Sequence, residues 1–335
     1  MKKITALFVA FFLLVGTLSG CKNTVSAQTA EHTQSSIQEK TLNIVTTIFP
    51  EYDWVRQILG DKADQAEITM LLDNGVDLHS YQPTADDIVK ISDCDLFIYV
   101  GGESDGWVRD VLKNASNKNR KVISLLDVLG DSVKTEEAVE GMEGHDHDED
   151  DDHEHEEEKD EHVWLSLKNA EVLVNAISDA LQKIDPDNKD AYAANTDAYV
   201  KRLSDLDAGY QLAVDGAARK TVLFGDRFPF RYLADDYGLS YYVAFVGCSA
   251  ESEASFETIA FLAEKADELN LPYVLTIEGT QHKIAEAIVQ NTAEKNQKVL
   301  TMDSMQSATS RDAANGTTYL SVMENNLSVL KEALD

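Results

Sequence analysis

Four short segments of this 335-residue chain carry side chains of the kinds that bind metal ions, and each lies beside a predicted strand or helix. His79 occurs in GVDLHSYQP and His162 in DEHVWLSL, each just before a predicted helix. Asp303 in TMDSM and Asp226 in FGDRFPFRYL each follow a predicted strand. Because α/β folds place their ligands at the ends of strands, these four residues are candidate ligands of a metal ion.

A fifth segment, residues 144–161, is too acidic to form a packed core. Residues 140–161 hold fourteen acids and one lysine, a local charge of −13 within a formal net charge of −31. We expect this loop to sample many conformations and to bind extra cations weakly. The overall charge excludes nucleic acid as a partner, because it would repel phosphates. Histidines alternate with the acids of the loop and make it a candidate auxiliary metal site: His145, His147, His153 and His155.

Apolar runs and helical patterns alternate along the chain and position these segments. Strands are expected at residues 41–47, 66–72, 95–102 and 121–125, and again at 220–224, 239–245, 272–278 and 298–302. Helical patterns lie between them, which predicts parallel sheets with helices on their faces.

Two consecutive helices are expected between the two groups of strands. Ser166 is a good N-cap for a helix over 167–184 with one apolar face. Pro186 opens a helix of more than twenty residues, about 40 Å long at 1.5 Å per residue. We therefore predict two parallel-sheet α/β lobes, at 41–185 and 217–335, joined by a long helix over 186–216, with the metal site in the cleft between the lobes.

The N-terminus has the layout of a secretion signal over residues 1–20, followed by a polar tether over 21–40. Small residues before Cys21 resemble a bacterial lipobox, which implies a lipid on its sulfur and attachment to the outer face of the cell membrane without spanning it. Cys94 and Cys248 make no disulfide framework, and we interpret both as small buried residues.

Several segments taken in order resemble one family, the cluster A-I solute-binding proteins, which are the metal-binding subunits of bacterial zinc or manganese ABC importers. The matching segments are TIFPEYDWVRQI, GVDLHSYQP, the acidic histidine run before HVWLSL, DPDNKDAYAANTDAY, YVLTIE and KVLTMDSM with TYLSVMENNL. The resemblance implies a non-enzymatic, monomeric, extracytoplasmic protein that captures Zn²⁺ for an ABC permease. It also implies that His79 and His162 bind the ion, and that the acidic run is the histidine-rich loop of zinc-selective members.

The chain departs from the family at the third ligand. There the family has a histidine or glutamate in a turn such as HDAFGYF, whereas this chain places Gly225 or Arg227 at that position, depending on the alignment. Asp226 is the one oxygen ligand in the turn and is our candidate; a turn cap or an ion pair with Arg227 is the alternative. Glu251 or Glu253 could substitute for it.

In the last loop, Asp303 matches a position where several members of the family use a carboxylate ligand. Glu278 lies at a strand end where the family usually has glutamate, and we expect it to support the site rather than to bind the ion.

Two imidazoles with two carboxylates suit either Zn²⁺ or Mn²⁺, a harder ion, and the histidines of the acidic loop favour zinc. A zinc hydrolase is a weaker alternative, because the sequence contains no HExxH or GxSxG motif. Some members of the family carry adhesin names, so an added role at the cell surface stays open.

Overall fold

Two four-stranded parallel sheets form the framework of this computed structural model, which describes residues 41–142, 158–249, 253–279 and 281–335. The first sheet has the strand order β2-β1-β3-β4 and the second has the order β6-β5-β7-β8, so both lobes share one topology. The strands are β1 Asn43–Thr46, β2 Glu67–Met70, β3 Leu96–Tyr99, β4 Lys121–Ser124, β5 Thr221–Phe228, β6 Ser240–Val246, β7 Tyr273–Ile277 and β8 Lys298–Met302. The two-lobed parallel α/β architecture predicted from the sequence is confirmed.

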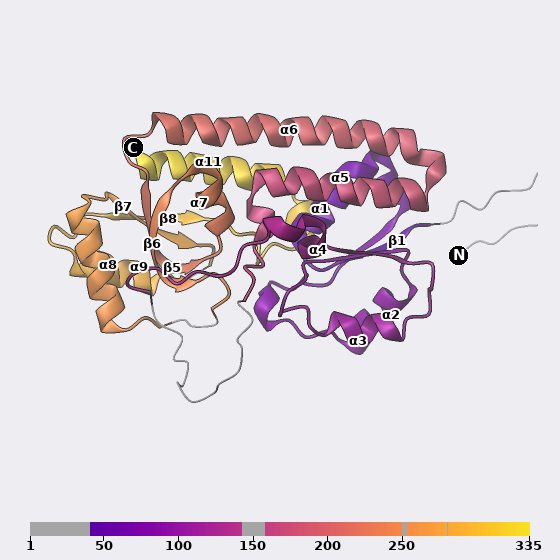
Figure 1. The fold of residues 1–335 in the computed structure, drawn as a ribbon, viewed down its shortest axis with the longest axis horizontal. Helices are drawn as coiled ribbons and strands as arrows, with labels where there is room; N and C mark the ends of the chain where they lie inside the picture. The colour runs from indigo at the N-terminus through magenta and orange to yellow at the C-terminus, as the bar shows by residue number, and fades with distance from the viewer. Residues whose placement is uncertain (1–40, 143–157, 250–252, 280) are drawn as a thin grey trace, which may run out of the picture. The chain divides into compact units, whose positions relative to one another are not determined.

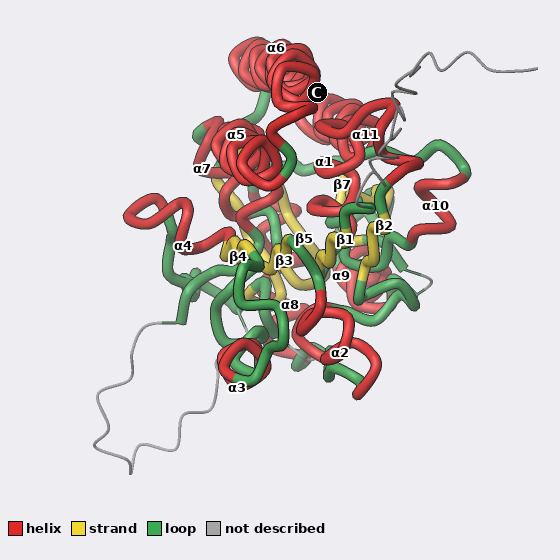
Figure 2. Tube along the Cα trace, turned by 90° about the vertical axis from the view of Figure 1, so that its right-hand side faces the viewer, coloured by secondary structure: helices red, strands yellow, loops and turns green. Residues whose placement is uncertain are grey.

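Helices cover both faces of these sheets, which is why the central strands are continuously apolar. In β3, Leu96, Phe97 and Ile98 are fully buried. Figure 2 shows α5, α6 and α11 on one side of the strands and α2 and α3 on the other. The α-helices are α1 Phe49–Leu59, α2 Ala85–Asp93, α3 Val108–Lys113, α4 Leu125–Leu129, α5 Leu167–Ile184, α6 Lys189–Gly216, α7 Arg231–Tyr237, α8 Phe256–Glu268, α9 Lys283–Asn291, α10 Ser310–Ala314 and α11 Tyr319–Leu334.

Helix α5 forms where its sequence pattern predicts it. The side chain of Ser166 accepts a hydrogen bond from the Asn169 backbone N–H at 3.0 Å and caps the first turn. Its predicted apolar face is buried at positions 170, 173, 174, 177 and 181, and Ile184 is half-buried. The N-terminal end of α5 follows directly after the short turn that carries His162.

The long helix α6 connects the two lobes and packs against both of them. It runs beside α5 and α1 of the first lobe and beside α11 of the second (Figure 1). Pro186 opens a separate 3₁₀ turn, Pro186–Asn188, so the α-helix begins three residues later than predicted. Inside the helix, the hydroxyl of buried Tyr210 donates to the Met323 carbonyl of α11 at 2.6 Å.

Buried polar contacts also join the first-lobe helix α1 to α11. The Asp53 carboxylate in α1 accepts from the backbone N–H of Tyr319 at 3.0 Å, and the ring of Trp54 meets the Tyr319 ring edge-on with centroids 5.2 Å apart. The Tyr319 hydroxyl in turn donates to the Trp164 carbonyl at 2.7 Å. The start of α11 is therefore anchored two residues from His162.

Replacing Tyr210 with phenylalanine keeps the ring and removes the hydrogen bond between α6 and α11. We expect Tyr210→Phe to lower the free energy of unfolding by about 0.5–1.5 kcal/mol, the usual contribution of one buried hydrogen bond. Half-buried Tyr52 provides the control, since Tyr52→Phe should change stability by less than about 0.5 kcal/mol. Equal effects in urea unfolding would show that the Tyr210 bond does not stabilise the helix pair.

Candidate metal centre

His79 lies on a short 3₁₀ turn, Leu78–Ser80, in the connection between β2 and α2. The Asp77 carboxylate caps this turn by accepting the backbone N–H of His79 at 3.0 Å. On the ring, Nδ1 lies 2.9 Å from Ser104 Oγ and 3.4 Å from Glu161 Oε2. Ser104 and Glu161 therefore contact Nδ1, and Nε2 lies on the opposite side of the ring.

His162 is fully buried and immediately precedes the 3₁₀ turn Val163–Leu165, at the N-terminal end of α5. Its Nδ1 lies 2.9 Å from Asp160 Oδ1, and the same oxygen accepts the backbone N–H of His162 at 2.9 Å. Burial alone would lower the pKa of His162, but the hydrogen bond and negative charge of Asp160, together with the charges of Glu161 and Asp77, raise that pKa. Asp160 thus fixes the orientation of the ring and increases its basicity, as partners of metal-binding histidines do.

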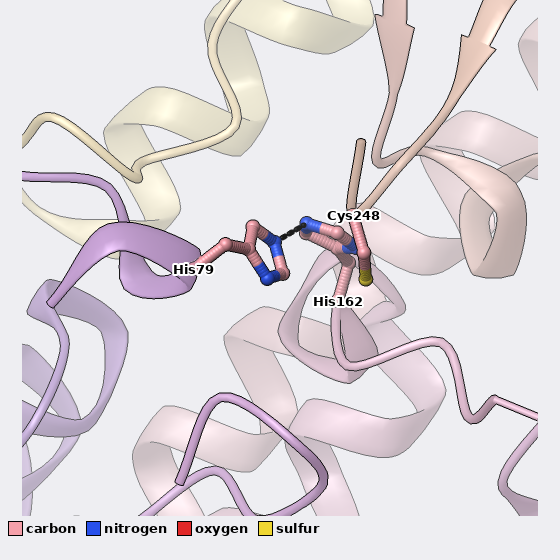
Figure 3. Close-up of side chains that lie close together, drawn as sticks. All are labelled: His79, His162 and Cys248. Atoms are coloured by element: carbon pink, nitrogen blue, oxygen red, sulfur yellow. Dashed lines mark hydrogen bonds between the residues drawn. The ribbon is translucent and has the colours of Figure 1, made fainter. Parts of the chain in front are cut away.

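The two imidazoles face each other through their Nε2 atoms, which lie 3.2 Å apart (Figure 3). Two ligands bound at 2.0–2.1 Å to a tetrahedral zinc ion are separated by roughly 3.3 Å. The observed separation therefore matches one edge of a zinc coordination tetrahedron. Both Nδ1 atoms already have partners in the protein, so the paired Nε2 atoms are the ones free to bind a metal ion.

Beside this pair lies Cys248, just beyond the end of β6 (Figure 3). Its Sγ and one nitrogen of each ring lie within 4.8 Å of one another, and in the described part of the chain no other group of three or more His, Cys, Asp or Glu residues is that close. Our interpretation of Cys248 as a small buried residue therefore missed its position, although Cys94 is indeed buried. The available signal was a Gly-Cys-Ser sequence at the carboxyl end of a predicted strand, the same context that singled out Asp303.

The structure corrects the placement of Asp226. Strand β5 continues to Phe228, and its register against β6 shifts between Phe224 and Arg227. Asp226 thus lies inside the strand, where its Oδ2 accepts from the Thr276 hydroxyl at 2.5 Å and from the Ile277 backbone N–H at 3.4 Å. These bonds fasten β5 to β7, and Asp226 is not in the group that contains the imidazoles.

Arg227, the residue after Asp226, pairs through its side chain with Asp77 of the first lobe rather than with Asp226. Its Nη2 lies 2.8 Å from Asp77 Oδ2, and its Nη1 donates to the Ser249 carbonyl at 3.3 Å. The charge of Arg227 helps to hold the pKa of Asp77 below its ordinary value, against the opposing effect of burial. One guanidinium therefore ties the turn that carries His79 to the segment that carries Cys248.

Asp303 follows β8 as predicted, but it also lies outside the group of imidazoles and thiol. Its Oδ1 accepts the Met305 backbone N–H at 2.7 Å, and burial together with the charge of Glu278 raises its pKa to about 6. Glu278 accepts hydrogen bonds from the Ser304 hydroxyl and backbone N–H, both at 2.7 Å. The Ser304 carbonyl accepts from the indole N–H of Trp164 at 2.9 Å, so Glu278 supports a loop that contacts the turn after His162.

Most of the remaining candidate residues lie outside the part of the chain that the structure describes. Glu253 is exposed, and Glu251 lies outside the described residues. The predicted signal sequence, the lipidation site Cys21 and the four histidines of the acidic loop lie outside them as well. The acidic segment is described again from Glu158, and its last two residues, Asp160 and Glu161, are the carboxylates that hold the imidazoles.

Comparison with known proteins shows which family the sequence resembles. Residues 44–333 match the family described as zinc-uptake complex component A, periplasmic. The chain is 33% identical over 336 residues to the high-affinity zinc uptake system protein ZnuA of Bacillus subtilis, covering 99% of this chain and 98% of that protein. It is 32% identical over 339 residues to the zinc-binding lipoprotein AdcA of Streptococcus pneumoniae, but spans only 62% of the length of AdcA.

Two solved structures are also similar to this chain in fold and sequence. The zinc(II)-bound ZnuA-like domain of Streptococcus pneumoniae AdcA aligns with a TM-score of 0.68 at 30% identity, covering 88% of this chain and 100% of that domain. The metal-dependent lipoprotein YcdH of Bacillus subtilis aligns with a TM-score of 0.70 at 29% identity, covering 88% of this chain and 99% of YcdH.

Removing the carboxylate that orients His162 tests the geometry of the centre. We expect Asp160→Asn to weaken zinc binding by about 10–100-fold, because the amide stabilises the imidazole less well and does not fix its orientation. The exposed Asp131 provides a matched control, and Asp131→Asn should leave the affinity unchanged. Both affinities are measured by competition with a zinc chelator. An unchanged affinity in Asp160→Asn would mean that zinc binds away from His162.

Proposed function

The chain belongs to the zinc-uptake complex component A family, and on that premise we propose that it captures Zn²⁺ outside the cytoplasm and delivers the ion to an ABC importer. The observation that carries the proposal is the pair of imidazole Nε2 atoms 3.2 Å apart, each ring held at Nδ1. Neutral imidazole is a preferred zinc ligand, and this spacing suits a zinc ion bound between the rings.

The position of the pair supports capture and release rather than catalysis. Both histidines lie on first-lobe segments that second-lobe residues contact: Arg227 pairs with Asp77, and the Tyr232 hydroxyl donates to the Asp160 carbonyl at 2.9 Å. Ligand sites between domains are common, and movement of one lobe would open or close such a site. We propose the lobe boundaries expected from the sequence, with the ion bound where the lobes meet.

We also propose that the protein is a monomeric lipoprotein held at the outer face of the membrane by a lipid on Cys21, where it meets its permease. The name of the AdcA relative, a zinc-binding lipoprotein, supports the anchor. None of the helices among the described residues is both long and apolar enough to cross a bilayer. A lipid with a polar tether would hold the binding domain close to the permease.

Zinc is favoured over manganese as the cargo. The two residues that face each other are imidazoles, and the carboxylates Asp226 and Asp303 that would favour Mn²⁺ lie outside their group. We retain Asp303 as a candidate carboxylate ligand, because it lies at the carboxyl end of the parallel sheet that also ends at Cys248.

Loss of one imidazole tests the proposed cargo site. We expect His79→Ala to weaken zinc binding by more than the roughly 10–100-fold that loss of an orienting partner costs. His282, which contacts Thr276 in the second lobe, provides the control, and His282→Ala should keep the affinity of the unaltered protein. Calorimetric zinc titration of the three proteins makes the comparison. Equal affinities would exclude His79 from the site.

We further propose that the acidic loop gathers zinc through its four histidines without forming the tight site. Deleting residues 144–157 should remove weak zinc sites and leave one tight site in a calorimetric titration. The deletion ends at residue 157 because Asp160 and Glu161 contact the imidazoles. Loss of the tight site would place a loop residue on the ion. Unchanged stoichiometry would mean that the loop histidines do not bind zinc.

A further inference from the structure

We infer that the thiolate of Cys248 is the third protein ligand of the ion, which makes the centre a two-imidazole, one-sulfur site. The inference rests on the proposed zinc capture and specifies the residue that completes the site. None of the four ligands expected from the sequence is a sulfur, and the two expected carboxylates lie outside the group of His79, His162 and Cys248.

The three side chains are close enough to bind one ion after the side chains rotate. In a tetrahedral site with Zn–N bonds of 2.0–2.1 Å and a Zn–S bond of 2.3 Å, nitrogen and sulfur are roughly 3.6 Å apart. The sulfur and one nitrogen of each ring lie within 4.8 Å of one another. Rotation of the Cys248 side chain toward the two Nε2 atoms would bring all three ligand atoms onto one ion, and the thiol proton is released to solvent as the Zn–S bond forms.

The backbone next to Cys248 packs closely against the His162 ring. A Cβ on Gly247 would meet the His162 ring at 3.0 Å, so glycine at this position lets the chain lie directly on the imidazole. The backbone N–H of Cys248 donates to Glu136 Oε1 at 2.9 Å. On the other side, Arg227 donates to the Ser249 carbonyl while it pairs with Asp77. The segment around Cys248 is thus fixed to the first lobe as well as to β5.

The same arrangement shows how the strand next to β5 can supply a ligand near Arg227. Arg227 is a cation and does not bind a metal ion, but it neighbours β6, where its register partner is Phe245. Cys248 follows that partner by three residues, beyond the carboxyl end of β6. The ligand is therefore provided by the adjacent strand, and the arginine serves as a positioning residue for the two segments that it joins.

A thiolate in this position sets the metal preference. Thiolate is a soft ligand that binds zinc well and Mn²⁺ poorly, whereas carboxylates suit Mn²⁺. Cys248 would thus discriminate between the two ions. Exchange of the thiol for a carboxylate, in Cys248→Asp, should reduce the ratio of zinc to manganese affinity.

Cobalt substitution tests the inference directly, because a Co²⁺–thiolate bond gives an intense near-ultraviolet charge-transfer band that nitrogen and oxygen ligands do not give. All samples are the full-length chain with Cys21→Ala, so that the lipidation cysteine contributes no thiolate. We expect the band in this background and in Cys94→Ser, whose cysteine is buried and donates to the Ile91 carbonyl. We expect it to be absent from Cys248→Ser and Cys248→His.

Zinc titrations of the same proteins complete the test. Cys248→Ser should weaken zinc binding by more than about 10–100-fold, and Cys248→His should restore tight binding without the band, which shows that the fold survives. Tight cobalt and zinc binding without any thiolate band would overturn the inference and leave the proposed function standing. Absence of zinc binding by the background protein would overturn both.

Discussion

Two imidazoles face each other across 3.2 Å, and much of the surrounding structure serves to hold them there. Two ring nitrogens at this separation need a proton or a cation between them, because their lone pairs would otherwise repel. Ser104 and Asp160 occupy the opposite nitrogens, and Glu161 lies 3.4 Å from the Nδ1 of His79. Burial opposes ionisation of Glu161, but the nearby His79 ring and the hydrogen bond from the Ser104 backbone N–H keep the pKa of this carboxyl below its ordinary value. The result is a negatively charged setting around two ring nitrogens, which favours a divalent cation.

The repeated topology of the two lobes explains how distant segments reach this point. Parallel strands place their carboxyl ends at one edge of each sheet, and the loops after β2, β6 and β8 carry His79, Cys248 and Asp303. His162 comes instead from the segment just before α5. The next helix, α6, packs against helices of both lobes. Trp164, Tyr319 and Ser304 join the turn after His162 to the second lobe through buried hydrogen bonds. These bonds fix the segment next to His162 against the second lobe.

The sequence predicts the framework well and the positions of the candidate ligands only in part. Buried parallel strands are visible as short apolar runs, and α5 as a face of apolar residues after Ser166, because these patterns are local. The meeting of His79 and His162, 83 residues apart, could be expected only from their resemblance to family motifs. Asp226 was misplaced because a register shift in β5 turns it toward Thr276, and no local pattern signals such a shift. Cys248 was missed because its proximity to the histidines depends on the packing of Gly247 against a ring from the other lobe.

Anomalous diffraction at the zinc absorption edge, from crystals of the zinc-loaded protein, tests the central claim most directly. We expect one strong peak bonded to Nε2 of both His79 and His162 at about 2.0–2.1 Å. A crystal in which the tightly bound zinc lies elsewhere, with no ion between these two imidazoles, would contradict the claim that they form the cargo site.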